Sequence, residues 1–117
     1  MGGMTLGRKQ ELFSRALGLL IQYGTFMGYE IRMGEVLRSK EEATRKGFPN
    51  SNHTRKLAAD LNLFRNGKYL SKTSDHTRLG EFWESLTGEY DGTKVVFAWG
   101  GRFKDGNHYS IQYGKVK

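Results

Sequence analysis

Residues 57–71 read LAADLNLFRNGKYLS, and this stretch decides the fold. A strand-forming run from Leu57 to Phe64 meets the dipeptide Asn66-Gly67, and the chain resumes as Lys68 to Ser71. Asn-Gly between two such runs is the strongest short-range signal for a β-hairpin, because both residues accept the positive φ angles of a two-residue turn. We therefore expect a pair of antiparallel strands over these residues.

A helix and another strand are expected on the N-terminal side of this hairpin. Apolar residues from Leu6 to Tyr23 recur at spacings of three and four, which predicts an amphipathic helix stopped by Gly24. From Tyr29 to Leu37 the apolar residues alternate until the phase slips around Gly34. That slip predicts a strand with a bulge.

Two further helices are indicated by capping signals. Ser39 and Glu42 form a capping box that predicts a short helix, and a loop over residues 48–56 follows it. Asp75 is expected to cap another helix, closed by Gly88, with its apolar side chains in the core. These apolar positions are Leu79, Phe82, Trp83 and Leu86.

The C-terminal part alternates enough to predict two more strands. Val95 to Trp99 and His108 to Tyr113 are expected as strands joined by a glycine-rich loop. The fold class that follows is α+β, with a small antiparallel sheet backed by helices. The chain of 117 residues suits a single domain with a core over about residues 5–115.

Composition limits the chemistry that can be expected. The chain has no cysteine, so neither disulfides nor thiolate ligands are possible, and a metal site must use histidine and carboxylates. It has three histidines, of which His76 is expected to be an exposed residue at a helix start. Asp91 with Glu89 offers oxygen ligands for calcium, although two carboxylates in a turn are more often simply solvated.

Charge and hydropathy bear on location and partners. The apolar run Ala16 to Ile21 is too short to span a membrane and follows Arg15, so it predicts neither a membrane helix nor a signal peptide. The net charge of +7 predicts attraction to polyanions, which include nucleic acid, anionic lipid and bacterial envelope polymers. Scattered basic residues that only keep a small domain in solution explain the same charge.

Four residues in two segments offer the chemistry of a zinc hydrolase. His53 and Asp60 lie in the first segment, and Asp105 and His108 in the second. Two imidazoles and one carboxylate can bind three faces of a zinc ion and leave the fourth for water, which a further carboxylate can deprotonate. His53 and Asp60 are seven residues apart, a separation that places them on opposite faces of one continuous strand. We therefore expect His53 in the loop and Asp60 in the strand that follows.

These segments resemble the zinc D-Ala-D-Ala carboxypeptidase and L-alanyl-D-glutamate peptidase family. Its pattern is Ser-x-His, a six-residue gap, Asp, and later an acidic residue followed three positions on by His. The resemblance implies that His53, Asp60 and His108 bind one zinc ion per chain and that Asp105 is the general base. Ser51 matches the serine that precedes the first histidine.

The resemblance covers roughly residues 29–113. Leu37 to Glu42 looks like the family's Tyr-Arg-Ser segment, which implies that Arg38 stabilises the oxyanion or holds a substrate carboxylate. Trp99 to His108 looks like the ending of small phage endolysins. The resemblance makes Ser51 and Trp99 the candidates for substrate binding. Lys56 departs from the family, which usually has glycine there, and a lysine asks for an ordinary backbone conformation.

The resemblance implies a Hedgehog/DD-peptidase-like fold and a zinc endopeptidase that cuts the L-alanyl-D-glutamate bond of peptidoglycan stem peptides to lyse bacterial cells. The alternative within the same chemistry is a D-Ala-D-Ala carboxypeptidase or dipeptidase. A basic nucleic-acid-binding domain is the alternative from another class, although its aromatic residues fall at core positions. We expect a monomer without a separate wall-binding domain, held in the host cytoplasm until release and attracted to the anionic bacterial envelope.

Overall fold

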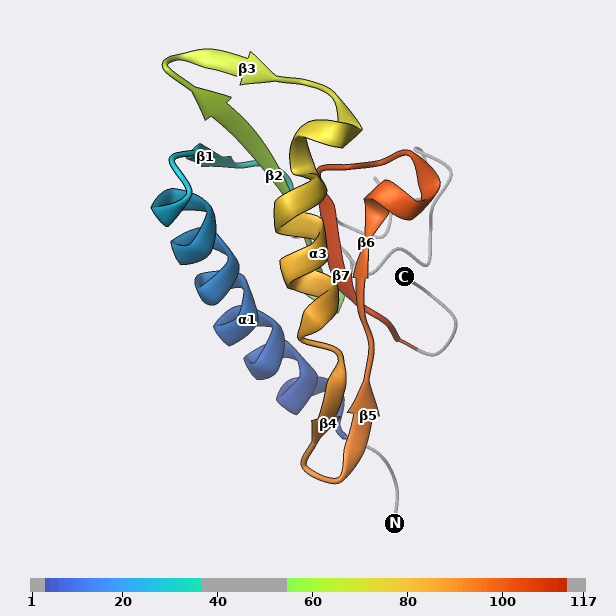
Figure 1. Ribbon diagram of the computed structural model, residues 1–117. Helices are drawn as coiled ribbons and strands as arrows, with labels where there is room; N and C mark the ends of the chain where they lie inside the picture. Colours follow the sequence, from blue (N-terminus) through green and yellow to red (C-terminus); the bar gives the residue numbers. More distant parts are fainter. Residues whose placement is uncertain (1–3, 37–54, 114–117) are drawn as a thin grey trace.

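The computed structural model describes residues 4–36 and 55–113, drawn in colour in Figure 1. Its helices are α1 (Leu6–Phe26) and α3 (Thr77–Ser85), with short 3-10 helices η2 (Thr73–His76) and η3 (Gly100–Phe103). Its strands are β1 (Glu30–Met33), β2 (Ala58–Arg65), β3 (Lys68–Leu70), β4 (Gly88–Tyr90), β5 (Thr93–Val95), β6 (Phe97–Trp99) and β7 (His108–Ile111). The helix expected after Ser39 lies outside the described residues.

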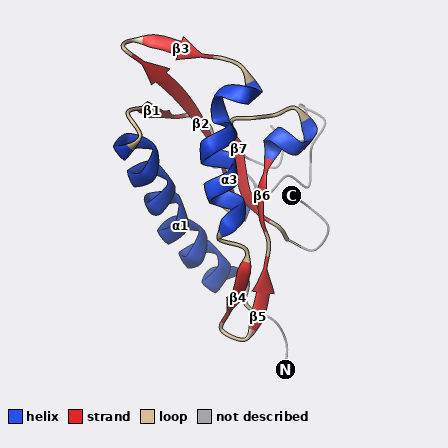
Figure 2. Cartoon of the chain, viewed as in Figure 1, coloured by secondary structure: helices blue, strands red, loops and turns tan. Residues whose placement is uncertain are grey.

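The main sheet is antiparallel and has the order β1-β2-β7-β6, with β3 paired to β2. Helices α1 and α3 lie side by side over one face of this sheet (Figures 1 and 2). The apolar side chains between the helices and the sheet form the core. They include Phe13, Leu17, Leu20, Leu61, Leu63, Leu79, Trp83, Phe97, Tyr109 and Ile111. The expected α+β fold with a small antiparallel sheet backed by helices is confirmed at this level.

The hairpin predicted from Asn66-Gly67 is confirmed. Asn66 has φ 53° and Gly67 has φ 76°, and β2 pairs with β3 in antiparallel register on either side of them. Two consecutive positive φ angles give this turn the twist that the flanking strands require. The turn therefore fixes the register of β3 against β2.

Helix α1 does not stop at Gly24 as predicted but continues to Phe26. Gly24 is a packing position, because a Cβ atom there would lie 2.8 Å from Cδ1 of Ile31 and 3.2 Å from Cδ2 of Leu79. The helix ends just before Gly28, which has a φ of 95°. Glycine adopts such a positive φ angle without steric strain. In the sequence, a glycine that packs inside a helix looks the same as a glycine that ends one.

The bulge predicted around Gly34 is confirmed by the backbone hydrogen bonds. The Gly34 amide donates to the carbonyl oxygen of Asp60 over 2.7 Å, and the Asp60 amide donates to the carbonyl oxygen of Glu35 over 2.8 Å. Two consecutive residues therefore oppose one residue of β2, which is the definition of a β-bulge. The bulge lies directly beside Asp60.

The start of α3 differs from the prediction. Asp75 lies inside η2, where its carboxylate accepts a hydrogen bond from the Lys72 amide over 2.9 Å, and α3 begins two residues later. The helix ends at Ser85, and Gly88 opens β4 instead of closing the helix. Trp83 is buried as expected and donates its indole N–H to the Ser110 carbonyl oxygen over 2.9 Å.

The strand predicted over residues 95–99 is divided between two pairings. Its first residue belongs to β5, which pairs with β4 through an Asp91-Gly92 turn with φ angles of 52° and 76°. Its last three residues, Phe97–Trp99, form β6, which pairs with β7. Asp-Gly is as clear a hairpin signal as Asn-Gly, so this second hairpin was predictable from the sequence.

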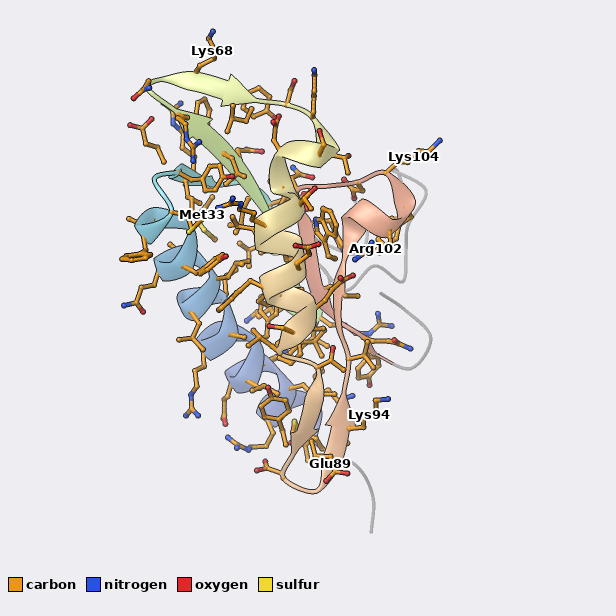
Figure 3. All side chains as sticks on the ribbon, viewed as in Figure 1. Met33, Lys68, Glu89, Lys94, Arg102 and Lys104 are labelled. Carbon is orange, nitrogen blue, oxygen red and sulfur yellow. The ribbon has the colours of Figure 1, made fainter. Side chains whose placement is uncertain are left out.

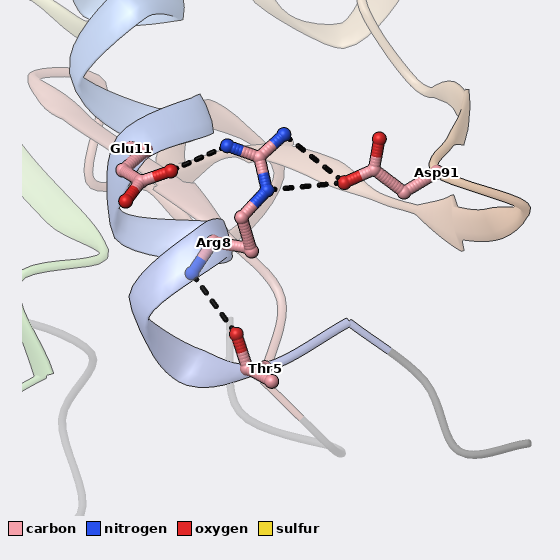
Figure 4. A network of polar contacts seen from close by, with 4 residues as sticks. All are labelled: Thr5, Arg8, Glu11 and Asp91. Atoms are coloured by element: carbon pink, nitrogen blue, oxygen red, sulfur yellow. Dashed lines mark hydrogen bonds and ion pairs between the residues drawn. The ribbon is translucent and has the colours of Figure 1, made fainter.

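An ion-pair network joins the β4–β5 hairpin to the start of α1 (Figure 4). The Arg8 guanidinium donates to Oδ2 of Asp91 over 3.0 and 3.2 Å and also pairs with Glu11, while Thr5 caps the helix by accepting from the Arg8 amide. Asp91 is thus paired with an arginine.

None of the helices in the described ranges has the length and apolar character needed to cross a membrane.

Candidate metal centre

Asp60 and His108 form one cross-strand pair between β2 and β7. The Leu61 amide donates to the Asn107 carbonyl oxygen over 2.9 Å, so the Asp60–His108 pair is of the non-hydrogen-bonded type. Side chains are closest in pairs of this type, because the Cα atoms are only about 4.5 Å apart. Oδ1 of Asp60 lies 3.6 Å from Nδ1 of His108.

The two side chains lie on the sheet face opposite the helices. Residues alternate between faces along a strand, and the neighbours Ala59, Leu61 and Tyr109 belong to the core on the helix side. The side chain of His108 is 8% exposed and that of Asp60 is 22% exposed. The pair therefore combines a buried imidazole with a carboxylate that solvent reaches in part.

Gly34 and the bulge hold Asp60 in place. A Cβ atom at position 34 would lie 3.0 Å from the Asp60 carbonyl oxygen and 3.2 Å from Cβ of Asp60. Contacts that short are tighter than ordinary van der Waals packing, so a larger residue would displace the strand that carries the carboxylate. The sequence slip at Gly34 is thus part of the architecture of the site.

Asp105 is tied to His108 by a tight turn. The His108 amide donates to the Asp105 carbonyl oxygen over 3.1 Å, and the Asp105 amide donates to the Gly100 carbonyl oxygen over 2.8 Å. A Cβ atom at Gly100 would lie only 2.1 Å from the Asp105 carbonyl oxygen and 2.8 Å from Cβ of His108. Only glycine at position 100 allows the loop to fold back in this way. Asp105 itself is exposed.

Trp99 is the core around which this loop folds. Its side chain is 5% exposed, and its indole N–H donates to the Gly106 carbonyl oxygen over 2.7 Å. Cβ atoms at Gly80 and Gly101 would lie 2.1 and 2.2 Å from the indole ring. These contacts make Trp99 a support for the loop, and its role in substrate binding stays a prediction.

Arg102 joins the same loop to α3. Its guanidinium donates to both carboxylate oxygens of Glu84 over 2.7 and 2.8 Å and lies 5.3 Å from the ring centre of Trp99. The hydrogen bonds from Arg102 lower the pKa of the Glu84 carboxyl, whose negative charge they stabilise. The loop between β6 and β7 is therefore anchored on both the core and the helix.

The donor set of Asp60 and His108 fits a zinc ion. Two ligands of a tetrahedral zinc, each about 2.0–2.2 Å from the metal, stand about 3.4 Å apart. The observed 3.6 Å between Oδ1 and Nδ1 is close to that separation. Within residues 4–36 and 55–113 no group of three His, Cys, Asp or Glu side chains could hold a metal. The expected third ligand His53 lies outside those ranges, as do Arg38 and Ser51.

His76 was expected to be exposed, and that prediction was wrong. The side chain is 3% exposed, and its Nδ1 lies 2.6 Å from the hydroxyl oxygen of Tyr109. Burial lowers the pKa of His76 to about 4, against a smaller raising effect of Asp75. Burial also raises the pKa of the Tyr109 phenol. A histidine just before an amphipathic helix gives no sequence signal for such burial, because its partner is a strand residue distant in the chain.

Lys56 also departs from expectation, because its φ is 61°. This is the left-handed conformation, which glycine adopts without strain and lysine adopts at a cost. The prediction of an ordinary backbone conformation at Lys56 was therefore wrong. The turn that leads into β2 has the geometry that a glycine would favour.

Comparison of the chain with protein-family models, with curated proteins and with solved structures gives no match. The interpretation of the site therefore depends on its own residues and their geometry.

Proposed function

We propose that this chain is a zinc peptidase of the D-Ala-D-Ala carboxypeptidase and L-alanyl-D-glutamate peptidase family, with the Hedgehog/DD-peptidase-like fold. The observation that carries the proposal is the cross-strand pair Asp60–His108 with its 3.6 Å spacing. His53, a residue outside the described ranges, would supply the third ligand. Bound zinc would activate water and polarise the carbonyl group of the substrate.

The position of Asp105 supports its role as general base. It is exposed, and it lies three residues before the proposed ligand His108. The His108 amide donates a hydrogen bond to the Asp105 carbonyl oxygen, which closes a tight turn between them. A carboxylate in such a position can accept a proton from the attacking water and deliver it to the departing amine. The core anchor at Trp99 and the glycine at position 100 fix the backbone of the turn that carries Asp105.

The backbone at Lys56 gives independent support. The family usually has glycine at this position, and the lysine here nevertheless adopts φ 61°, a conformation typical of glycine. The turn between the expected ligand His53 and the strand residue Asp60 thus has the backbone shape that the family's glycine would allow.

The proposed substrate is the L-alanyl-D-glutamate bond of peptidoglycan stem peptides. D-Ala-D-Ala carboxypeptidase activity is the second candidate, since both reactions use the same zinc chemistry and release a D-amino acid residue as the leaving group. The non-enzymatic nucleic-acid hypothesis receives no support from the aromatics of β6 and β7, because Phe97, Trp99 and Tyr109 are buried, although Tyr69 on β3 is exposed.

Digestion of purified peptidoglycan, followed by mass spectrometry of the new termini, tests the proposal. New N-terminal D-glutamate is expected, and it should disappear with chelator and in the Asp105→Asn variant. Free D-alanine released from otherwise intact stem peptides would replace the endopeptidase with the carboxypeptidase. A zinc-supplemented protein that cuts neither bond would overturn the proposed function.

A further inference from the structure

Five side chains continue the sheet face that carries the proposed metal centre toward the β2–β3 hairpin. Side chains at every second position of a strand share one face, and the register places members from β1 and β3 directly opposite those of β2. The fifth member comes from the turn before β7 and is hydrogen-bonded to one of them. We call this set the β2 strip: Arg32, Asn62, Phe64, Tyr69 and Asn107.

Asn62 and Asn107 form an amide pair at the end of the β2 strip nearest the metal centre. Nδ2 of Asn107 donates to Oδ1 of Asn62 over 3.3 Å, and both residues are half-buried. Within residues 4–36 and 55–113 no further hydrogen bond engages Nδ2 of Asn62 or Oδ1 of Asn107. The pair therefore offers one donor and one acceptor side by side, which is the complement of another amide group.

Phe64 and Tyr69 form an aromatic platform at the other end of the strip. Their ring centres are 5.2 Å apart, and their planes are tilted by 42°. The guanidinium of Arg32 lies 3.9 Å from the centre of the Phe64 ring, and Tyr69 is 52% exposed. Cross-strand aromatic pairs stabilise hairpins in any case, so the exposed ring surface is the feature that points to a ligand.

The charges around the β2 strip favour a neutral ligand over a polyanion. Arg32 is the one cationic member of the strip. Glu30 lies opposite Phe64 on β1, where its carboxylate accepts a hydrogen bond from the Gly67 amide over 3.1 Å, and Asp60 lies at the metal end. A nucleic acid strand is bound through several basic contacts to its phosphates, and this face offers one guanidinium beside two carboxylates.

We propose that the β2 strip binds the glycan strand of peptidoglycan, with its amide pair on the acetamido group of an N-acetylated aminosugar and its aromatic platform against the sugar ring. An acetamido group presents one N–H and one carbonyl oxygen, which match the remaining acceptor and donor of Asn107 and Asn62. A pyranose ring has faces of C–H groups, which pack on aromatic rings as other apolar surface does. The Arg32 guanidinium can donate to hydroxyl groups of the same sugar.

This inference rests on the proposed function and selects between its two candidate reactions. At about 3.4 Å per residue, Asn62 lies about 7 Å and Phe64 about 14 Å from Asp60 along β2. The L-alanine of a stem peptide is joined to the sugar through a lactyl group, so a cut after that residue leaves the sugar about 7 Å from the metal. A cut between the terminal D-alanines leaves the sugar about 17 Å away in an extended substrate, beyond the strip. The spacing therefore fits the L-alanyl-D-glutamate bond.

Binding of the glycan can be measured without zinc and without turnover. We would titrate the full-length protein with tri-N-acetylchitotriose and follow the backbone amides of residues 62–70 and the side-chain amides of Asn62 and Asn107 by NMR. Cellotriose, which has similar sugar rings but no acetamido groups, should bind at least about fivefold more weakly, as expected for the loss of two hydrogen bonds. Equal binding of the two sugars, or no shift with either, would overturn the proposal. A stronger response of the same residues to hexathymidylate would assign the strip to nucleic acid instead.

Variants then assign the parts of the strip. Tyr69→Ala should weaken binding of tri-N-acetylchitotriose about tenfold because it removes the exposed ring, and Tyr69→Phe should retain most of the binding. The matched control is Lys68→Ala, because Lys68 precedes Tyr69 in β3 and projects into solvent at the hairpin (Figure 3). Asn62→Ala should reduce the preference for the acetylated sugar over cellotriose. Unchanged binding in Tyr69→Ala would contradict the proposal without relying on a variant of a half-buried residue.

The two proposals fail in different ways. If the sugar maps to residues 62–70 but peptidoglycan stays intact, the zinc peptidase is wrong and a glycan-binding face remains. If peptidoglycan is cut while the Tyr69→Ala variant keeps its KM for the polymer, the function stands and the glycan-binding strip is wrong. If both proposals are right, Tyr69→Ala should raise KM about tenfold for peptidoglycan and less for a free stem peptide that lacks the sugar.

Discussion

Asp60 and His108 face each other across β2 and β7, so the backbone pairing sets the 3.6 Å between Oδ1 and Nδ1. A carboxylate and an imidazole held in this way need little rearrangement to bind a metal.

Zinc should stabilise the unmodified protein and lose that effect when either residue of the pair is changed. A ligand that binds only the folded state stabilises it, by about 2.7 kcal/mol at a hundredfold excess over Kd. The melting temperature rises as a result. Asp60→Asn and His108→Ala should abolish the rise in a thermal scan. The control is Asp91→Asn, which removes a carboxylate paired with Arg8 and should leave the response to zinc intact. A zinc-independent melting temperature in the unmodified chain would contradict the metal centre.

Asp105→Asn should separate metal binding from turnover. The change keeps the size of the side chain and removes the base, and Asp105 is not one of the proposed ligands. We expect one zinc per chain by elemental analysis and a fall in kcat of at least about 10²-fold. Loss of zinc from this variant would instead make Asp105 a ligand.

Gly100→Ala should destabilise the fold and displace Asp105. The added Cβ would lie 2.1 Å from the Asp105 carbonyl oxygen, and overpacking of this kind costs about 1–3 kcal/mol. The comparison is Gly18→Ala in α1, where no atom lies within 4 Å and the helix should gain about 0.5–1 kcal/mol. Urea unfolding of the two variants measures both effects. A neutral Gly100→Ala would show that the loop has room that these contacts deny.

Protonation of His76 should weaken the fold as the pH falls. The pKa of His76 in the folded protein, about 4, lies below its ordinary value of 6.5, so below pH 6.5 the unfolded chain binds the proton more readily. The contribution is fully present above pH 6.5 and is lost as the pH falls toward 4, a change of about 3 kcal/mol. Urea midpoints measured across this range should decline, and His76→Gln should flatten that part of the profile. An equally steep decline in the variant would assign it to other groups.

Lys56→Gly should stabilise the protein even though glycine has the more flexible unfolded chain. Relief of the left-handed strain, about 1–2 kcal/mol, outweighs the extra backbone entropy of glycine, about 0.4–1 kcal/mol. Lys68→Gly in β3 is the matched control and should lower the free energy of unfolding, because its backbone carries no such strain. A loss of stability in Lys56→Gly would mean that the lysine side chain contributes more than its strain costs.

The parts of the fold that local patterns determine were predictable. The Asn66-Gly67 hairpin and the bulge at Gly34 followed from turn chemistry and from a slip in alternation. The packing role of Gly24 was not predictable, because a glycine that makes room for Ile31 and Leu79 looks in sequence like one that ends a helix. The burial of His76 could not be predicted either, because its partner Tyr109 lies on a strand remote in the sequence. The resemblance implied that Asp60 and His108 bind one metal, and the pairing of the two residues across β2 and β7 was found only in the structure.

Side chains of β7 alternate between the two faces of the sheet, so neighbouring residues have different roles. His108 faces Asp60, and Tyr109, the next residue, faces the helices and bonds to His76. Loss of one residue from the turn before β7 would place the Tyr109 phenol opposite Asp60 and Ser110 in the core, whereas gain of one residue would place Asn107 opposite Asp60 and the His108 ring in the core. The length of that turn is therefore as much a determinant of the site as the identity of any side chain in it.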